Sequence, residues 1–131
     1  GYCKIGEAVV TPAFDLKDVK YIIHTVGPKY NSGLKDQDQV LYDAYYNALN
    51  CARNNCCHSI TFPLISAGRF GFPLDDAWAI AIKACKEFIQ NDPVYEIQIK
   101  FAVQKEYIIN AGREKLSTAL GKHHESEGGL N

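Results

Sequence analysis

The sequence contains no methionine among its 131 residues. Removal of an initiator before the small residue Gly1 accounts for that, and so does origin as a piece of a longer protein, which we favour for reasons given below. Two further patterns are missing. No apolar run approaches the ~18 residues that cross a bilayer, and the start has no signal-peptide pattern. We therefore expect a cytoplasmic protein with no membrane partner.

The chain also lacks an excess of either charge, because its formal net charge is −1. A domain whose main partner is a nucleic acid backbone normally carries a basic footprint, so nucleic acid is an unexpected partner. Hydrophobic residues make up 47% and charged residues 22%, which is ordinary globular usage. At this length we expect one packed domain.

Cysteine is present five times, without regular spacing. An odd, irregular set is a poor disulfide framework, so we interpret these residues as reduced thiols. Cys56, Cys57 and His58 are consecutive, but adjacent cysteines without a second ligand pair do not make a zinc spacing. We expect a helix-to-strand connection there, and neither a metal site nor a cofactor.

Hydropathy alternates between strand and helix patterns along the chain. Strands are expected at 21–26, 59–66 and 96–103, with a short one at 7–11; helices are expected at about 38–54, from Asp75 to before Asp92, and at about 106–120, interrupted by Gly112. This order predicts an α/β fold with a parallel or mostly parallel sheet. Residues 1–120 form the expected domain and 121–131 a flexible tail.

Both longer helices carry an apolar face at helical spacing. The first face consists of Leu41, Ala44, Tyr45, Ala48, Leu49 and Ala52, and the second of Trp78, Ala81, Ile82, Cys85, Phe88 and Ile89. Asn54 and Asn55 are expected to end the first helix. Asp75 is the expected N-cap of the second helix.

The segment Ser66-Ala67-Gly68-Arg69-Phe70-Gly71-Phe72-Pro73 follows the second strand. Ligands of open α/β sheets bind beyond the carboxyl ends of the strands. Gly68 and Gly71 let the main chain approach a ligand closely, and successive N–H groups of such a turn can converge on phosphate oxygens. Ser66 adds a hydroxyl donor, Arg69 a charge-assisted contact, and Phe70 an apolar face for a sugar.

Taken alone, this loop is a modest signal. Glycines between a strand and a helix often serve only as turn residues. The segment is not a P-loop, since no Gly-Lys-Ser/Thr follows, and it does not match the Gly-x-Gly-x-x-Gly dinucleotide fingerprint.

The neighbouring segments strengthen the signal of this loop, because the chain from Gly6 to about Leu120 resembles the macro domain family of ADP-ribose-binding modules. Four stretches in the right order carry the resemblance: Gly6-Glu7-Ala8 with Thr11; Ile22-Ile23-His24-Thr25-Val26-Gly27-Pro28; Ser59-Ile60-Thr61-Phe62-Pro63-Leu64-Ile65-Ser66-Ala67-Gly68; and Phe70-Gly71-Phe72-Pro73. Pro63 is unusual in a strand, but it belongs to the family pattern.

The resemblance implies a three-layer α-β-α fold around a mixed sheet, with ADP-ribose or a derivative as ligand and ADP-ribosylated protein as a potential partner. The loop would wrap the diphosphate and distal ribose. The implied ligand-binding residues are Ser66, Ala67, Gly68, Arg69, Phe70 and Gly71, with Gly27 and Pro28. Where many members place an aromatic ring beside adenine, this chain has Val103, with Phe101 two residues earlier.

The resemblance also implies that the fold is truncated at its N-terminus. The opening strands, the first glycine-rich loop and the following helix have no counterpart here, and in hydrolytic members the catalytic Asn and Asp come from that part. The catalytic residues therefore stay unknown. Two alternatives to a binding module remain open: a hydrolase acting on ADP-ribosylated protein or O-acetyl-ADP-ribose, and a degenerate fragment that binds nothing.

Other candidate residues have simpler interpretations. His24 lies within a strand and is expected to be structural. Tyr42, Tyr45 and Tyr46 suit helix packing, and the pair His123-His124 suits a solvated tail. Asp75 and Asp76 are favourably placed at a helix N-terminus.

Overall fold

The computed structural model describes residues 3–12, 21–33 and 35–120. The order of elements is β1 (Ala8–Pro12), β2 (Tyr21–Thr25), α1 (Gln37–Asn54), β3 (Ser59–Phe62), α2 (Leu74–Asn91), β4 (Gln98–Phe101) and α3 (Glu106–Leu120). The α/β class predicted from the sequence is confirmed. The expected tail, 121–131, lies outside the described residues. None of the described helices is long and apolar enough to cross a membrane.

The described strands form two two-stranded sheets. β1 and β2 pair antiparallel, with Ala8 opposite Thr25, whereas β3 and β4 pair parallel, with Ser59 opposite Gln98. The expectation of one mostly parallel sheet is therefore wrong in this part of the chain. The alternation of strand and helix correctly predicts the β3–α2–β4 crossover, but it does not determine whether β2 and β3 bond to each other.

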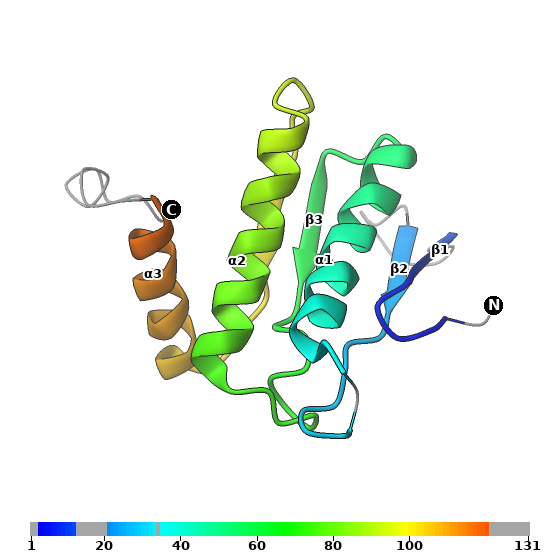
Figure 1. The fold of residues 1–131 in the computed structure, drawn as a ribbon. Helices are drawn as coiled ribbons and strands as arrows, with labels where there is room; N and C mark the ends of the chain where they lie inside the picture. The colour runs from blue at the N-terminus through cyan, green and yellow to red at the C-terminus, as the bar shows by residue number, and fades with distance from the viewer. Residues whose placement is uncertain (1–2, 13–20, 34, 121–131) are drawn as a thin grey trace.

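Helix α1 lies over both sheets and contacts β1, β2 and β3 (Figure 1). Its buried residues are those predicted from the periodicity: Leu41, Ala44, Tyr45, Ala48, Leu49 and Ala52. Asn55 caps its end, where the backbone and the side chain both donate to the Cys51 carbonyl. The predicted stop at Asn54 and Asn55 is thus confirmed.

Helix α2 packs beside α1, and α3 packs against α2 (Figure 1). The buried residues of α2 are Ala77, Trp78, Ala81, Ala84 and Phe88, whereas Ile89 is 46% exposed. The prediction of this buried face is therefore partly wrong, because the elements packed against α2 cover Ala77 and Ala84 and leave Ile89 exposed. The predicted N-cap is also wrong: Pro73 precedes the helix, and its carbonyl accepts the N–H of Ala77.

Gly112 does not interrupt α3, contrary to the prediction. The helix runs through it from Glu106 to Leu120, and Gly112 lies directly against the indole of Trp78. The Trp78 Nε1–H donates to the carbonyl oxygen of Ile108 over 2.8 Å. A glycine at this position permits close packing of two helices.

Candidate functional site

The loop between β3 and α2 begins where the strand can no longer be extended. Pro63 has no N–H to give to a ladder, and the last bond to the β4 side runs from the N–H of Ala102 to the carbonyl of Phe62. Ser66 has a φ of 65° and Gly71 a φ of 71°. The first is uncommon for a residue with a side chain. These two residues turn the chain so that residues 66–71 form a compact loop.

Main-chain bonds hold this loop in shape. The N–H of Phe72 donates to the carbonyl of Ser66 (2.9 Å), and the N–H of Gly71 donates to the carbonyl of Gly68 (3.0 Å). In the described part of the chain, the N–H groups of Gly68, Arg69 and Phe70 donate to no acceptor. Three adjacent donors without partners, in a turn of this kind, are suited to an anion.

The loop after β2 lies beside the loop after β3. The N–H of Tyr30 donates to the carbonyl of Phe70 over 2.8 Å, and the ring of Tyr30 meets that of Phe72 edge-on, with centroids 5.1 Å apart. Gly27 and Pro28 are buried, and Gly27 lies against the side chains of Ser66 and Ile65; the predicted contact of these two residues with a ligand stays a prediction. Arg69 is exposed, and Phe70 is 38% exposed, so these two side chains can be reached by a ligand.

Ser66 presents a buried hydroxyl at the base of the loop. Its Oγ is the one buried side-chain nitrogen or oxygen without a hydrogen-bond partner among the residues that the structure describes. A buried polar atom without a partner costs free energy, and such atoms often belong to sites that a ligand completes. A Cβ on Gly27 would collide with this oxygen, so glycine is required there.

Tyr45 of α1 holds the chain just before the loop. The N–H of Ile65 donates to the Tyr45 hydroxyl oxygen over 2.8 Å. Burial, the larger effect, raises the pKa of Tyr45 above its usual range, although the bond from Ile65 acts in the opposite direction. The sequence predicted only helix packing for Tyr45. The available signal was a hydroxyl on an otherwise apolar face, because a buried tyrosine usually has a hydrogen-bond partner.

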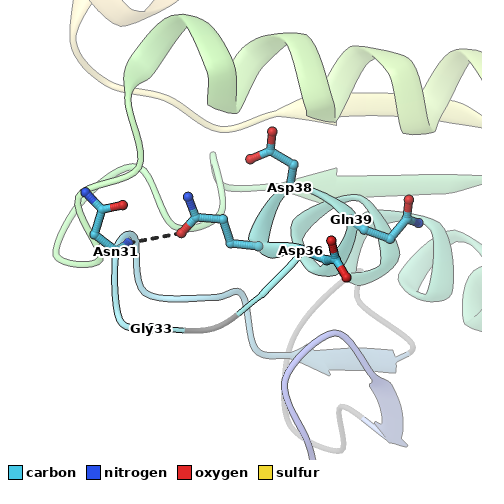
Figure 2. Close-up of a pocket in the computed structure, with 6 residues that line it drawn as sticks. Asn31, Gly33, Asp36, Asp38 and Gln39 are labelled. Carbon is cyan, nitrogen blue, oxygen red and sulfur yellow. Dashed lines mark hydrogen bonds between the residues drawn. The ribbon is translucent and has the colours of Figure 1, made fainter.

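An open pocket of about 710 Å³ lies at the start of α1 (Figure 2). Its lining residues are Asn31, Gly33, Asp36, Gln37, Asp38 and Gln39. The N–H of Asn31 donates to Gln37 Oε1 over 3.0 Å, which joins the loop to the helix. Because two carboxylates line it, this pocket is less suited to phosphate than the loop at 66–71.

The predicted adenine-side residues lie at the end of β4. Phe101 packs into the core, with ring centroids 5.1 Å from Trp78, 5.7 Å from Phe62 and 6.1 Å from Tyr45. Val103 follows the strand and is half-buried. Since Phe101 already packs against three rings of the protein, its predicted contact with a ligand stays a prediction, as does that of Val103.

The remaining candidates have structural partners. His24 Nε2 lies 2.9 Å from Thr11 Oγ1 on the paired strand, in agreement with the expected structural role. His58 stacks on Tyr95, with centroids 4.9 Å apart, and follows the two cysteines between α1 and β3. All five cysteines are free thiols.

Comparison with known proteins identifies the family. A model of the macro domain matches residues 1–81, which is more than half of the chain. The chain belongs to the macro domain family. The family resemblance inferred from the four sequence stretches is therefore confirmed.

Two relatives and one solved structure illustrate the match. A macro domain-containing protein of Methanosarcina mazei is 43% identical over 94 residues, covering 72% of this chain and 50% of the relative. The O-acetyl-ADP-ribose deacetylase of Escherichia coli K12 is 42% identical over 106 residues, covering 81% and 59%. The Oceanobacillus iheyensis macrodomain with ADP has a TM-score of 0.81 and 34% identity, covering 91% of this macro domain and 61% of that chain.

The partial coverage of these relatives limits what can be inferred from them about this chain. This macro domain spans 50% of the Methanosarcina protein and 59% of the Escherichia protein. The fold of the shared part is that of a macrodomain, in agreement with the α/β fold predicted from the resemblance. The activity of a whole relative does not follow from this shared part.

Proposed function

We propose that this macro domain binds ADP-ribose or a close derivative, with the loop from Ser66 to Gly71 as its diphosphate site. The observation that carries the proposal is the row of three N–H groups, at Gly68, Arg69 and Phe70, that have no acceptor among the described residues. The Oceanobacillus macrodomain, which has the same fold, was solved with ADP. Such N–H groups suit an anion, and the diphosphate is the anionic part of ADP. We therefore assign the diphosphate of the ligand to this loop.

The side chains of the loop support the same ligand. Arg69 is exposed and can form a charge-assisted bond to a phosphate oxygen. The partly exposed ring of Phe70 can cover a ribose. The unpartnered hydroxyl of Ser66 is a further donor at the base of the loop.

Calorimetry with ADP-ribose, ADP and adenosine tests the proposal on the 131-residue chain. ADP-ribose and ADP should bind at least about tenfold more tightly than adenosine, because only they carry the charges that the loop accepts. A folded chain that releases no heat with ADP-ribose would contradict the proposal and favour the degenerate, non-binding alternative.

Two variants with matched controls locate the site. Gly71→Ala introduces a side chain at a φ of 71°, whereas Gly33→Ala does so at a φ of 87° outside the loop; a Cβ meets nothing within 4 Å at either position. Arg69→Gln removes a charge from the loop, and Arg113→Gln removes one from the exposed surface of α3. Each loop variant should weaken ADP-ribose about tenfold, and each control should not. Equal effects within a pair would place the site elsewhere.

A hydrolytic activity is the second candidate, supported by the 42% identity to an O-acetyl-ADP-ribose deacetylase. Such an enzyme would orient a water against the distal ribose by positioning and electrostatics. The family resemblance implies a catalytic Asn and Asp without a counterpart among these 131 residues. Turnover therefore distinguishes the enzyme from a binding module. Release of acetate from O-acetyl-ADP-ribose, or of ADP-ribose from a modified protein, would favour the enzyme instead.

A further inference from the structure

The bond between Tyr45 and Ile65 connects helix α1 to the base of the candidate loop. The Ile65 N–H lies three residues beyond the end of β3, and its acceptor is a side chain from another element instead of a ladder carbonyl. Ile65 is buried, at 9% exposure. Water is therefore poorly placed to replace the tyrosine hydroxyl as acceptor.

The ring of Tyr45 is held firmly enough to act as a fixed support. The residue has 0% exposure, and its ring meets that of Phe62 edge-on, with centroids 5.1 Å apart, and that of Phe101 at a tilt. Both phenylalanines come from the β3–β4 sheet. The hydroxyl therefore has a defined position relative to the strand from which the loop departs.

The loop has three points of attachment, and Tyr45 provides the first. Ile65 is held by Tyr45, Phe70 by the N–H of Tyr30, and Phe72 closes the turn on Ser66. The unpartnered N–H groups at 68–70 lie between the first and the last of these points. A shift of Ile65 would consequently change the direction in which those donors point.

We propose that Tyr45 is a positioning residue for the ligand-binding loop, and that its hydroxyl orients the donors of Gly68, Arg69 and Phe70 through Ile65. This inference rests on the proposed function, because it assigns a role within the same site. Tyr45 itself is buried beneath the loop and would not contact the ligand.

Tyr45→Phe is the direct test, because it removes the hydroxyl and keeps the ring. Tyr46→Phe is the matched control. The Tyr46 hydroxyl also accepts a hydrogen bond, from Asn91 Nδ2 on α2 (2.7 Å), and its ring meets Phe88. Both variants lose one hydroxyl from adjacent positions of α1, but only Tyr45 contacts the loop.

Amide hydrogen exchange in the ligand-free protein provides the first measurement. In the unmodified chain the Ile65 amide should be protected, although it lies outside β3. In Tyr45→Phe, exchange at the hydrogen-bonded amides of Ile65, Gly71 and Phe72 should rise about tenfold, while the β1–β2 amides stay unchanged. Tyr46→Phe should leave residues 65–72 unchanged. A variant that only lowers the overall stability of the protein would instead raise exchange throughout the chain, and that result would overturn the proposal.

Calorimetry with ADP-ribose provides the second measurement. The Kd should rise about tenfold in Tyr45→Phe and stay within about twofold in Tyr46→Phe. If the unmodified chain binds and Tyr45→Phe binds equally well, the positioning role is wrong while the proposed function stands. If the unmodified chain does not bind, the proposed function is wrong, and exchange still decides whether Tyr45 orders the loop. If Tyr45→Phe does not fold, an unprotected Ile65 amide in the unmodified chain overturns the inference.

Discussion

Gly27 lies directly against Ser66, and the contact leaves no space for a side chain. A Cβ on Gly27 would overlap both Ser66 Oγ and Ile65 Cγ2. The two segments come from different parts of the fold, since Gly27 follows β2 and Ser66 follows β3. The strands are not hydrogen-bonded to each other within the described residues, yet the loops beyond their ends pack tightly.

Gly27→Ala should therefore destabilise the protein and weaken ADP-ribose binding. We expect a loss of about 1–3 kcal/mol in the free energy of unfolding, because the added methyl would overlap the packed side chains of Ser66 and Ile65. Urea unfolding measures it. Gly68→Ala is the control: a Cβ there meets nothing within 4 Å, so stability should change by less than about 0.5 kcal/mol. Equal losses in both variants would show that the Gly27–Ser66 contact does not determine stability.

Gly112→Ala should loosen the packing of α3 on α2. An added Cβ would lie 2.7 Å from Trp78 Cε2, and this overlap should cost about 1–3 kcal/mol, offset by up to about 1 kcal/mol of helix propensity. Trp78 is the only tryptophan of the chain, so its fluorescence should shift to longer wavelength. Asn110→Ala, at an exposed position of the same helix, should leave emission unchanged. Unaltered emission and stability in Gly112→Ala would contradict the close packing.

Stability should fall at alkaline pH, in part because of Cys85. Burial raises the pKa of this thiol from 9.0 to about 12. Between these values the unfolded chain loses the proton while the folded chain keeps it, so stability present below pH 9 is lost as the pH rises towards 12. The slope for one such group is at most about 1.4 kcal/mol per pH unit.

Urea unfolding at pH 8 and pH 10 checks this dependence. Cys85→Ala should lose about 1 kcal/mol less than the unmodified chain between the two pH values. The exposed Cys56, changed to Ala, serves as the control and should not alter the dependence. The same dependence in the Cys85 variant and the unmodified chain would exclude Cys85 as a cause.

Alkylation at pH 8 should distinguish the cysteines. The thiolate is the reactive form, and burial raises the pKa of both Cys51 and Cys85. Cys56 is exposed and should react with iodoacetamide at least about tenfold faster than Cys85. Peptide mass spectrometry measures the order, and the difference should disappear in urea. Equal rates in the folded protein would be inconsistent with the packing of α2.

Much of the fold could be predicted from local patterns. The buried face of α1 is the clearest case, since all six residues from Leu41 to Ala52 were identified from helical spacing. The neighbouring helix was predicted less well: Ile89 is exposed, and Ala77 and Ala84 are buried in its place. Spacing indicates that a face exists, but the elements packed against a helix decide which residues of that face are covered.

In the candidate loop, too, some features follow from the local sequence and others only from the tertiary structure. Its glycines, its serine and its place after a strand are local features, and together with the neighbouring stretches they determined the family. The tertiary structure alone decided that β2 pairs with β1, that Gly27 meets Ser66, and that Tyr45 holds Ile65. The physical reason is that these contacts join segments far apart in the chain. Their geometry depends on how α1 docks against both sheets, which no local pattern encodes.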